Sequence, residues 1–350
     1  MSVKAFKQEA KDSFKDDLGE GGMSGYLSTG CYDLDRALNG GLRFGRFHLW
    51  AGKESAGKTS MSLHTMRQTN LINWETGKYD PSLSNPTPVM FVDLEGTYDD
   101  NWAEKIGVPR DAQDDYNYVA RPATGNVAAD LVLNGLESGE FGLIIVDSNE
   151  AFTATTTLEK STEDNIMCDR AKILARMYRV GQAHMNRMIN KDKPWKTPTI
   201  LCLNQIRDQI GGYGASAPVY PGGRSQLQYS STIVQFNSPL VMDDQKKSYG
   251  KGEFKGVVKK NKCGPPKKNF AYQMAIRDMS QEGDLRAGQI DNSGSIIKDI
   301  KSLGLMTKTD SGYEVFNKPY RVQSDFKKEL TENPQLEREV WYQLIEMDRT

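Results

Sequence analysis

The stretch GKESAGKT, residues 52–59, decides the fold of this chain. It follows an apolar run at residues 47–50 and opens a segment with helical spacing, so it joins a predicted strand to a predicted helix. In such loops the glycines let backbone N–H groups surround phosphates, the lysine reaches the β- and γ-phosphate oxygens, and the threonine hydroxyl binds Mg²⁺. The alternative interpretation, an ordinary glycine turn, is given little weight because of the predicted strand and helix on either side. The pattern predicts a site for ATP and Mg²⁺, lined by Gly52, Glu54, Ser55, Ala56, Gly57, Lys58, Thr59 and Ser60.

Further apolar runs alternate with helical stretches along the chain. They lie at residues 89–92, 143–146 and 200–203. This alternation is typical of an α/β domain with a mainly parallel sheet. Three later runs have no long helices between them, so we expect added antiparallel strands that extend the sheet at one side. These later runs lie at residues 232–236, 256–259 and 270–275.

Spacing and composition divide the chain into three parts. We expect a short N-terminal helix within an oligomerisation segment at residues 1–27, a P-loop core at 28–278, and a small C-terminal α/β lobe at 279–350. In the lobe, one helix is expected to end at Gly304 and a second to begin at Asn333 and Pro334. The apolar face of the first helix consists of Ile296, Ile297, Ile300 and Leu303.

Bulk composition narrows the class of protein. With 45 basic and 46 acidic residues the net charge is −1, which excludes a protein that holds nucleic acid by overall charge alone. The 4 cysteines include no CxxC pair, so neither a disulfide framework nor a zinc site is indicated. No apolar run reaches the roughly 18 residues of a membrane helix, and no signal peptide is evident. We therefore expect a soluble intracellular protein without a membrane partner.

Three polar residues follow the predicted parallel strands. Asp147 ends one strand, where it could hold Mg²⁺, although without the P-loop a helix cap would be the more common role. Glu95 follows another strand, where it could activate a water beside the γ-phosphate; spacing alone leaves this undecided against a role in capping the turn. Gln205 ends a third strand, and its uncharged amide could sense the γ-phosphate.

A long segment at residues 206–223, rich in glycine and containing two prolines, follows Gln205 directly. It has neither helical nor strand spacing and is predicted to be a functional loop, the alternative being a surface excursion. Arg207 and Arg224 could contact phosphates, and Ile210 or Tyr213 could wedge between bases. A second candidate loop surrounds Met167.

Nine lysines lie between residues 246 and 268 against the single acid Glu253, which makes this the basic patch of a neutral chain. For Lys246, Lys247 and Lys251 a solvated face of an edge strand is the preferred interpretation. Lys260 and Lys262 are two apart just before Gly264, so both are expected to point the same way. This arrangement suits insertion into the phosphate site of a neighbouring subunit.

Taken together, these motifs resemble the RecA recombinases, including their bacteriophage relatives, from Ser28 to the C-terminal lobe. The resemblance rests on the P-loop and on the stretches FVDLEGTYDDNWAEKIGV, LIIVDS, LNQIRDQIG, the Gly222–Gly223 pair and VVKKNK. It implies a RecA-type core, and the departures from the bacterial sequences favour a phage-type member.

The resemblance also assigns roles to residues. It makes Glu95 the catalytic glutamate, Asp147 the Mg²⁺ aspartate and Gln205 the γ-phosphate sensor. Lys58, Lys260 and Lys262 join the catalytic set, the latter two acting on ATP held by the adjacent protomer. Asp99 and Trp102 would contact adenine. Met167 and Ile210 would separate bases, and the DNA-binding set would consist of Met167, Lys172, Arg179, Arg207, Ile210, Gly222, Gly223 and Arg224.

The function implied is that of an ATP-dependent recombinase, which forms helical filaments on single-stranded DNA and exchanges strands with a homologous duplex. Expected partners are single- and double-stranded DNA, further copies of the chain, and single-strand-binding and mediator proteins. The expected location is the cytoplasm, at the nucleoid, or the host cytoplasm for a phage protein. A ring-forming DNA motor is the main alternative, and a non-catalytic DNA-coating scaffold is the third.

Overall fold

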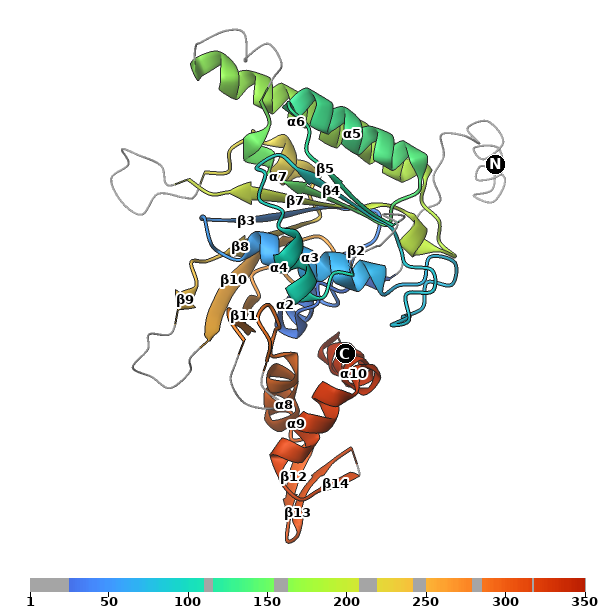
Figure 1. Ribbon diagram of the computed structural model, residues 1–350, viewed down its shortest axis with the longest axis vertical. Helices are drawn as coiled ribbons and strands as arrows, with labels where there is room; N and C mark the ends of the chain where they lie inside the picture. Colours follow the sequence, from blue (N-terminus) through green and yellow to red (C-terminus); the bar gives the residue numbers. More distant parts are fainter. Residues whose placement is uncertain are drawn as a thin grey trace, which may run out of the picture.

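The structure is a computed structural model that describes residues 25–109, 116–153, 163–207, 219–241, 250–278, 285–316 and 318–349. Its centre is a large, mostly parallel sheet in the strand order β11-β10-β8-β3-β7-β6-β4-β5 (Figure 1). The parallel strands are β3 (Phe47–Gly52), β4 (Val89–Asp93), β5 (Asn117–Ala120), β6 (Leu143–Asp147), β7 (Thr199–Gln205) and β8 (Thr232–Phe236). The predicted α/β fold class is confirmed.

The antiparallel extension begins one strand later than predicted. β8 lies parallel to β3, with His48 opposite Thr232, so the expectation of an antiparallel strand at 232–236 is wrong for this pairing. The physical reason is that the chain returns to the amino end of the sheet through the segment after β7 and the five-residue helix α7 (Ser225–Tyr229). β10 (Lys251–Asn261) and β11 (Asn269–Ala275) are antiparallel, as predicted, and β9 (Leu240–Val241) pairs with β10.

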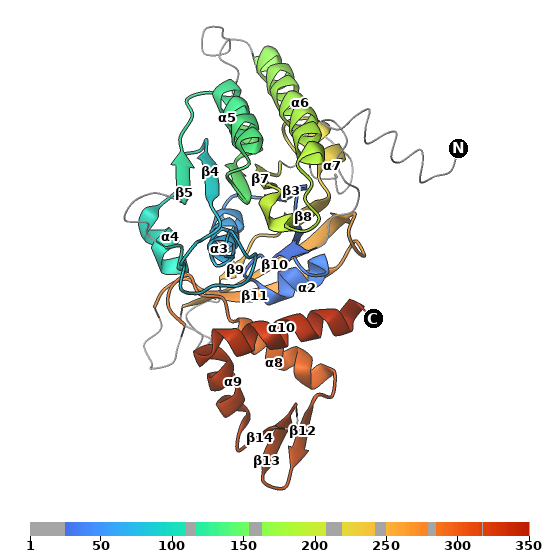
Figure 2. The ribbon, with the colours of Figure 1, turned by 90° about the vertical axis from the view of Figure 1, so that its right-hand side faces the viewer.

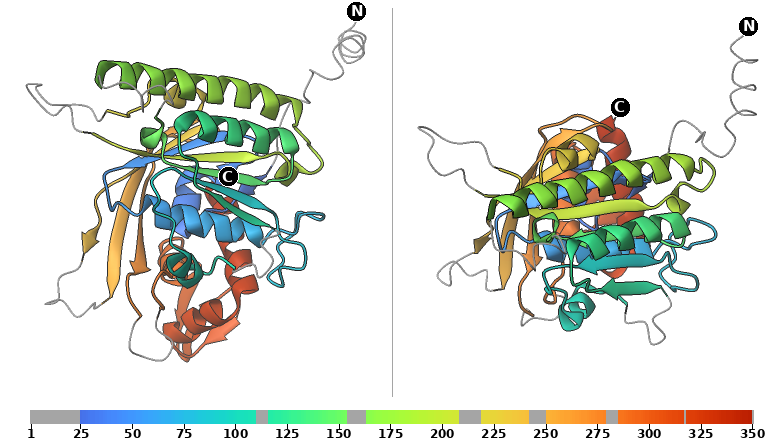
Figure 3. Two further views of the ribbon diagram at one scale, coloured as in Figure 1. Left: turned by 45° about the horizontal axis from the view of Figure 1, so that its top comes forward. Right: turned by 90° about the horizontal axis from the view of Figure 1, so that it is seen from above.

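Helices cover both faces of this sheet. α5 (Gly125–Ser138) and α6 (Glu163–Arg187) lie side by side over one face (Figure 3). The other face packs on α2 (Tyr32–Leu38), α3 (Lys58–Asn70) and α4 (Asp100–Ile106). Successive residues of β3 face opposite sides of the sheet: Leu49 packs with α5 and α6, whereas Trp50 packs on the opposite face. The parallel strands are buried on both faces, which explains their continuous apolar sequence.

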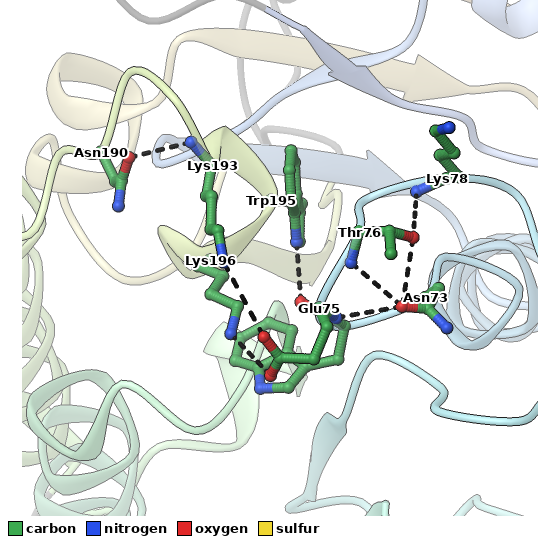
Figure 4. Close-up of polar contacts among 9 residues, drawn as sticks. Asn73, Glu75, Thr76, Lys78, Asn190, Lys193, Trp195 and Lys196 are labelled. Carbon is green, nitrogen blue, oxygen red and sulfur yellow. Dashed lines mark hydrogen bonds and ion pairs between the residues drawn. The ribbon is translucent and has the colours of Figure 1, made fainter.

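The amino ends of the strands are covered by two connecting segments that pack against each other. One runs from Leu71 to Pro88 and the other contains the short helix η3 (Pro194–Lys196) (Figure 4). Trp195 Nε1 donates to the carbonyl oxygen of Trp74 at 2.9 Å, and Lys196 pairs with Glu75 at 3.0 Å. A small sheet of β1 (Tyr26–Leu27) and β2 (Leu42–Arg43) precedes β3. These contacts lie at the end of the sheet opposite the P-loop.

The C-terminal lobe lies apart from the sheet, below it in Figures 1 and 2. It consists of α8 (Asn292–Ser302), β12 (Met306–Thr309), β13 (Gly312–Val315), β14 (Lys318–Tyr320), α9 (Gln323–Glu332) and α10 (Pro334–Arg349). Asn333 caps α10 by accepting from the backbone N–H of Leu336 at 3.1 Å, as predicted. The expected α8 face is correct for its isoleucines, but Leu303 lies beyond the helix and is 47% exposed.

Ion pairs and one aromatic contact join the lobe to the core. Tyr32 and Trp341 meet edge to face at 5.6 Å between ring centroids. Lys251 pairs with Asp291 at 3.2 Å, so the expectation that it lies on a solvated edge is wrong. The reason is that the Lys251 side chain reaches the carboxylate of Asp291, the N-cap of α8, rather than solvent. The predicted helix at residues 2–18 lies outside the described residues. Within the described parts of the chain, none of the helices has the length and apolar character needed to cross a membrane.

Candidate functional site

The P-loop turns from β3 directly into α3, as its sequence predicts. Gly57 has a φ of 86°, and a Cβ there would lie 2.9 Å from the ring of Phe254, so only glycine fits. The Lys58 ammonium group donates to the carbonyl oxygens of Gly52 at 3.0 Å and Lys53 at 2.8 Å. Burial lowers the pKa of Lys58, while Asp147 and Glu95 oppose this effect by their charge. The lysine therefore stays inside the loop, poised toward a phosphate.

Strands β4 and β6 bring the predicted carboxylates together. Asp93 lies opposite Asp147 in the register of these strands. The Thr59 hydroxyl donates to Asp147 Oδ2 at 2.8 Å, and Ser148 Oγ donates to Glu95. Burial raises the pKa of Asp147 to about 6. Asp93 instead accepts from the backbone N–H groups of the turn after β4, so the capping role falls to Asp93 and leaves Glu95 at the site.

The site formed by Lys58, Thr59 and Asp147 fits Mg²⁺ and a nucleoside triphosphate. A threonine hydroxyl beside a single carboxylate is the protein share of a magnesium site whose other ligands are phosphate oxygens and waters. No group of three or more metal-ligating histidine, cysteine or acidic side chains occurs among the described residues. A cavity of about 270 Å³ adjoins the loop and is lined by residues 55–60 and Trp102, among others.

Trp102 therefore lines the same cavity as the P-loop, and its expected contact with adenine stays a prediction. Its Nε1 donates to the Ser60 hydroxyl at 3.0 Å, which fixes the ring beside the start of α3. Asp99 caps α4 by accepting from the backbone N–H of Trp102 at 2.7 Å. Asp99 thus has a structural role that orients Trp102. Its contact with adenine remains a prediction.

Gln205 ends β7 next to the P-loop. It lies opposite Gly52 in the parallel register, and the backbone N–H of the following residue, Ile206, donates to the Gly52 carbonyl at 3.2 Å. The P-loop and the start of the glycine-rich segment are therefore joined by a backbone hydrogen bond. The role of Gln205 as a γ-phosphate sensor stays a prediction.

Both ends of the glycine-rich segment are fixed by the core. Arg207 and Val219 form a two-bond antiparallel bridge at 3.1 and 3.0 Å, which closes the base of the segment. Arg207 also pairs with Glu150, in the short helix η1 (Asn149–Ala151) that follows β6. Gly222 has a φ of 101° and packs against α6, where a Cβ would lie 2.5 Å from Leu174. Loop base, β6 and α6 are thus in contact.

The other predicted DNA residues are distributed around this base. Lys172 and Arg179 are exposed on α6, and Lys172 pairs with Asp169 at 3.3 Å. Arg224 is exposed at the start of α7, beside Gly223. Met167 belongs to α6, but its side chain, like all of Ile210, lies outside the described residues. Their predicted contacts with DNA bases stay predictions.

Lys260 and Lys262 point to the same place, as predicted. Lys260 Nζ donates to the carbonyl oxygen of Leu227 at 2.6 Å, and Lys262 Nζ to that of Gln228 at 3.4 Å. These carbonyls lie in α7, so both ammonium groups contact its C-terminal half, where the helix dipole favours cations. Burial and the neighbouring Lys262 lower the pKa of Lys260. Action on the ATP of an adjacent protomer remains a prediction.

Three residues of the site escaped sequence analysis. Asn149, Glu150 and Gln226 connect the strand ends to the base of the glycine-rich segment. The only signal for Asn149 and Glu150 is that they belong to a run of three polar residues, with Ser148, directly after the strand of Asp147. Gln226 has no signal, because α7 is too short to show helical spacing.

Comparison with known proteins agrees with this geometry. The family model described as the RecA N-terminal domain matches residues 18–278. The chain is 29% identical to Protein RecA of Ruegeria pomeroyi over 275 residues, which cover 77% of this chain and 72% of that protein. It is 28% identical to Protein RecA of Cutibacterium acnes over 317 residues, which cover 90% of this chain and 80% of the relative. This chain therefore belongs to the RecA family of recombinases.

Proposed function

We propose that this protein is a DNA-dependent ATPase that forms a filament on single-stranded DNA and exchanges it with a homologous duplex. The observation that carries the proposal is the direct connection between the nucleotide site and the glycine-rich segment. The Gly52 carbonyl accepts from both Lys58 Nζ and the N–H of Ile206. A change at the P-loop is thereby transmitted to the segment that the family resemblance assigns to DNA.

In the proposed reaction the chain binds and orients the triphosphate. Backbone N–H groups of the P-loop and Lys58 hold the phosphates, while Thr59 and Asp147 would hold Mg²⁺. Bound Mg²⁺ would neutralise charge on the phosphate oxygens. Glu95, held by Ser148, is positioned to orient a water and accept its proton. Gln205 would report the γ-phosphate to the DNA segment.

Lys260 and Lys262 complete the proposed site across the filament. Their ammonium groups are held by carbonyls of α7, which follows the DNA segment. In the proposed filament they contact the γ-phosphate of the neighbouring protomer. ATP turnover then requires assembly, with the N-terminal segment at residues 1–27 as a proposed contact between protomers.

The proposed setting follows from the same family membership. The ligands are single- and double-stranded DNA, and single-strand-binding and mediator proteins are proposed as further partners. A cytoplasmic location is proposed because the substrates are there. Binding should fall with rising salt and depend little on sequence, since phosphate contacts and base stacking carry little base information.

The test is the formation of joint molecules between a single strand and a homologous labelled duplex, with ATP and Mg²⁺. We expect product with the homologous duplex and none with a heterologous one. Lys58→Ala should abolish both product and ATP hydrolysis, whereas Glu95→Gln should abolish hydrolysis but keep ATP-dependent DNA binding. Closed rings on DNA without joint molecules would instead support a ring-forming motor and refute the recombinase.

A further inference from the structure

The side-chain amide of Gln226 connects parts of the site that are distant in the sequence. Its Oε1 accepts from Nδ2 of Asn149 at 3.0 Å and from Nδ2 of Asn204 at 2.8 Å. Its Nε2 donates to the carbonyl oxygens of Pro221 at 2.5 Å and Gly223 at 3.2 Å. Gln226 is fully buried, so this amide has its partners inside the protein rather than in water.

Each partner of Gln226 adjoins a functional group. Asn149 lies two residues after Asp147, and Asn204 directly precedes Gln205. Pro221 and Gly223 flank Gly222 at the C-terminal base of the glycine-rich segment. Both asparagines are also fully buried. The amide of Gln226 therefore spans the distance from two strand ends at the nucleotide site to the turn that closes the DNA segment.

The chemistry of the cluster makes these parts move together. A buried amide that loses its partners carries a large desolvation cost, so a displacement of β6 or β7 favours a matching displacement of the turn. The turn has little freedom of its own, because Gly222 packs against Leu174 and Gly223 against Ala171, both on α6. A Cβ on Gly223 would lie 3.1 Å from that of Ala171.

Gln226 also belongs to the helix that holds the paired lysines. It is the second residue of α7, and the carbonyls of the next two residues accept from Lys260 and Lys262. A helix of five residues moves as one unit. A shift of Gln226 is therefore transmitted to both lysines as well as to the Gly222–Gly223 turn.

We propose that Gln226 is a positioning residue that couples the nucleotide site to the DNA segment, by holding the Gly222–Gly223 turn against the ends of β6 and β7. The inference rests on the proposed function, since it takes the P-loop as the ATP site and the glycine-rich segment as a DNA contact. Gln226 acts through Asn149, Asn204 and the turn, and its role is to set their relative position.

Two substitutions of Gln226 separate its hydrogen bonds to Asn149 and Asn204 from its hydrogen bonds to the turn. Gln226→Leu removes the acceptor for both asparagines and the donor to the turn. Gln226→Glu has nearly the same volume and keeps acceptor oxygens for Asn149 and Asn204, but a carboxylate has no N–H for the carbonyls of Pro221 and Gly223. Because the glutamate also places a charge beside these carbonyls, it should selectively weaken the hold on the turn, to which Asn204 Nδ2 still donates at the Pro221 carbonyl at 2.8 Å.

The experiment measures the Kd of the full-length protein for a labelled oligo-dT strand by fluorescence anisotropy, once with a slowly hydrolysed ATP analogue and once with ADP. The ratio of the two Kd values is the coupling factor. We expect both variants to reduce this factor by about fivefold or more, a change within the usual range of allosteric coupling. Affinity for the ATP analogue without DNA should stay at the wild-type value, because the P-loop is intact.

The matched control is Gln182→Leu, which removes a surface amide of α6 that donates to Asn186 at 2.9 Å. It should keep the wild-type factor. A merely structural role of Gln226 would weaken DNA binding equally with both nucleotides and leave the factor unchanged, which would refute the inference while the proposed function stands. Equal affinities for wild type in the two nucleotide states would refute both. If Gln226→Leu melts at a lower temperature than the wild type, the coupling factor of Gln226→Glu, measured below its own melting temperature, decides between the two roles.

Discussion

The carboxylate of Glu150 lies where the nucleotide site meets the DNA segment. Its side chain is only 12% exposed and pairs with Arg207, whose side chain is 69% exposed. Arg170 adds a second positive charge near Glu150: burial lowers the pKa of Arg170, the charge of Glu150 opposes this effect, and the charge of Arg207 adds to it. A DNA phosphate that contacts Arg207 therefore competes with Glu150 for the same guanidinium group.

Glu150→Gln is expected to release Arg207 and tighten binding of single-stranded DNA a few-fold. One additional phosphate contact would steepen the dependence of log Kd on log salt by about 0.7. Anisotropy titrations at several salt concentrations measure both the Kd for single-stranded DNA and its dependence on salt. Glu75→Gln, which removes an ion pair with Lys196 at the opposite end of the sheet, is the matched control. Weaker binding by Glu150→Gln would show that Glu150 presents Arg207 to DNA instead of restraining it.

Two histidines, His48 and His64, are buried at separate places in the core. His48 Nε2 faces the carbonyl of Arg43 at 2.9 Å and must donate, so Nδ1 accepts from the Thr232 hydroxyl at 2.7 Å. Burial lowers the pKa of His48 to about 4, and the charge of Arg46 adds to the effect. Burial likewise lowers the pKa of His64 to about 3. Both rings stay neutral in the folded protein.

Because the unfolded His48 titrates near its ordinary pKa, the stability it contributes is present above about pH 6.5 and is lost as the pH falls toward 4. The loss from His48 between pH 7.5 and pH 5 is about 2 kcal/mol. Buried Asp33 and Asp35, whose pKa values burial raises to about 6 and 7, act in the opposite direction. The difference between wild type and His48→Gln in urea midpoints at the two pH values isolates the histidine, and equal pH dependence in both proteins would contradict the assignment.

At the scale of elements, the Gly222–Gly223 turn connects the two candidate DNA segments. It packs on α6, which contains Met167, so the expectation of a loop around Met167 is wrong, and it ends the segment that follows β7. Both glycines have positive φ values, of 101° and 85°. The close approach to α6 and the backbone conformation both require glycine here.

Gly222→Ala is therefore expected to push α6 and the turn apart and to reduce DNA-stimulated ATP hydrolysis by about tenfold or more, a loss of at least about 1.4 kcal/mol of coupling. Gly304→Ala in the C-terminal lobe provides the control, because its φ is 70° but a Cβ there would have no atom within 4 Å. Gly304→Ala therefore introduces backbone strain as Gly222→Ala does, but no steric clash. Steady-state ATPase assays with and without oligo-dT measure the effect, and equal behaviour of the two variants would assign it to strain alone.

At the scale of the whole molecule, the C-terminal lobe is attached through a few charged contacts around Asp299. Its carboxylate accepts from the Tyr32 hydroxyl at 2.7 Å and pairs with Arg36 at 2.6 Å. Both partners belong to α2, on the core side. Arg36 and Lys268 also pair with Asp348, at 3.7 and 2.9 Å. These ion pairs, which are shielded from solvent only in part, hold the lobe together with the packing of Tyr32 on Trp341.

Asp299→Asn is expected to lower the free energy of unfolding of the lobe by about 2 kcal/mol, because a largely buried charged pair loses one partner while Arg36 retains solvent contact. Thermal unfolding followed by tryptophan fluorescence reports the change through Trp341. Glu332→Gln removes the exposed pair with Lys328 at 3.7 Å and should cost less than about 0.5 kcal/mol. A loss in Asp299→Asn as small as that of the control would show that the lobe is held by apolar packing alone.

The sequence by itself determined the parallel core and the P-loop with Lys58 and Thr59, and it marked Asp147 and Gln205 as candidate site residues, whereas the role of Glu95 came from the family resemblance. It could do so because these features are local: an apolar strand, a glycine pattern and a polar residue at the strand end each fit within a few positions. The paired lysines were also marked by their spacing, whereas Trp102 was found by family resemblance, and the structure gives each of them specific contacts.

Only the tertiary structure decided how these parts are connected. The parallel pairing of β8 with β3, the ion pair of Lys251 with Asp291, and the contacts of Glu150 and Gln226 all join residues distant in sequence. Such contacts leave no periodic signal, because a single buried amide or carboxylate has no spacing to detect. The physical reason is that buried polar groups obtain their partners only after strands from different parts of the chain have come together.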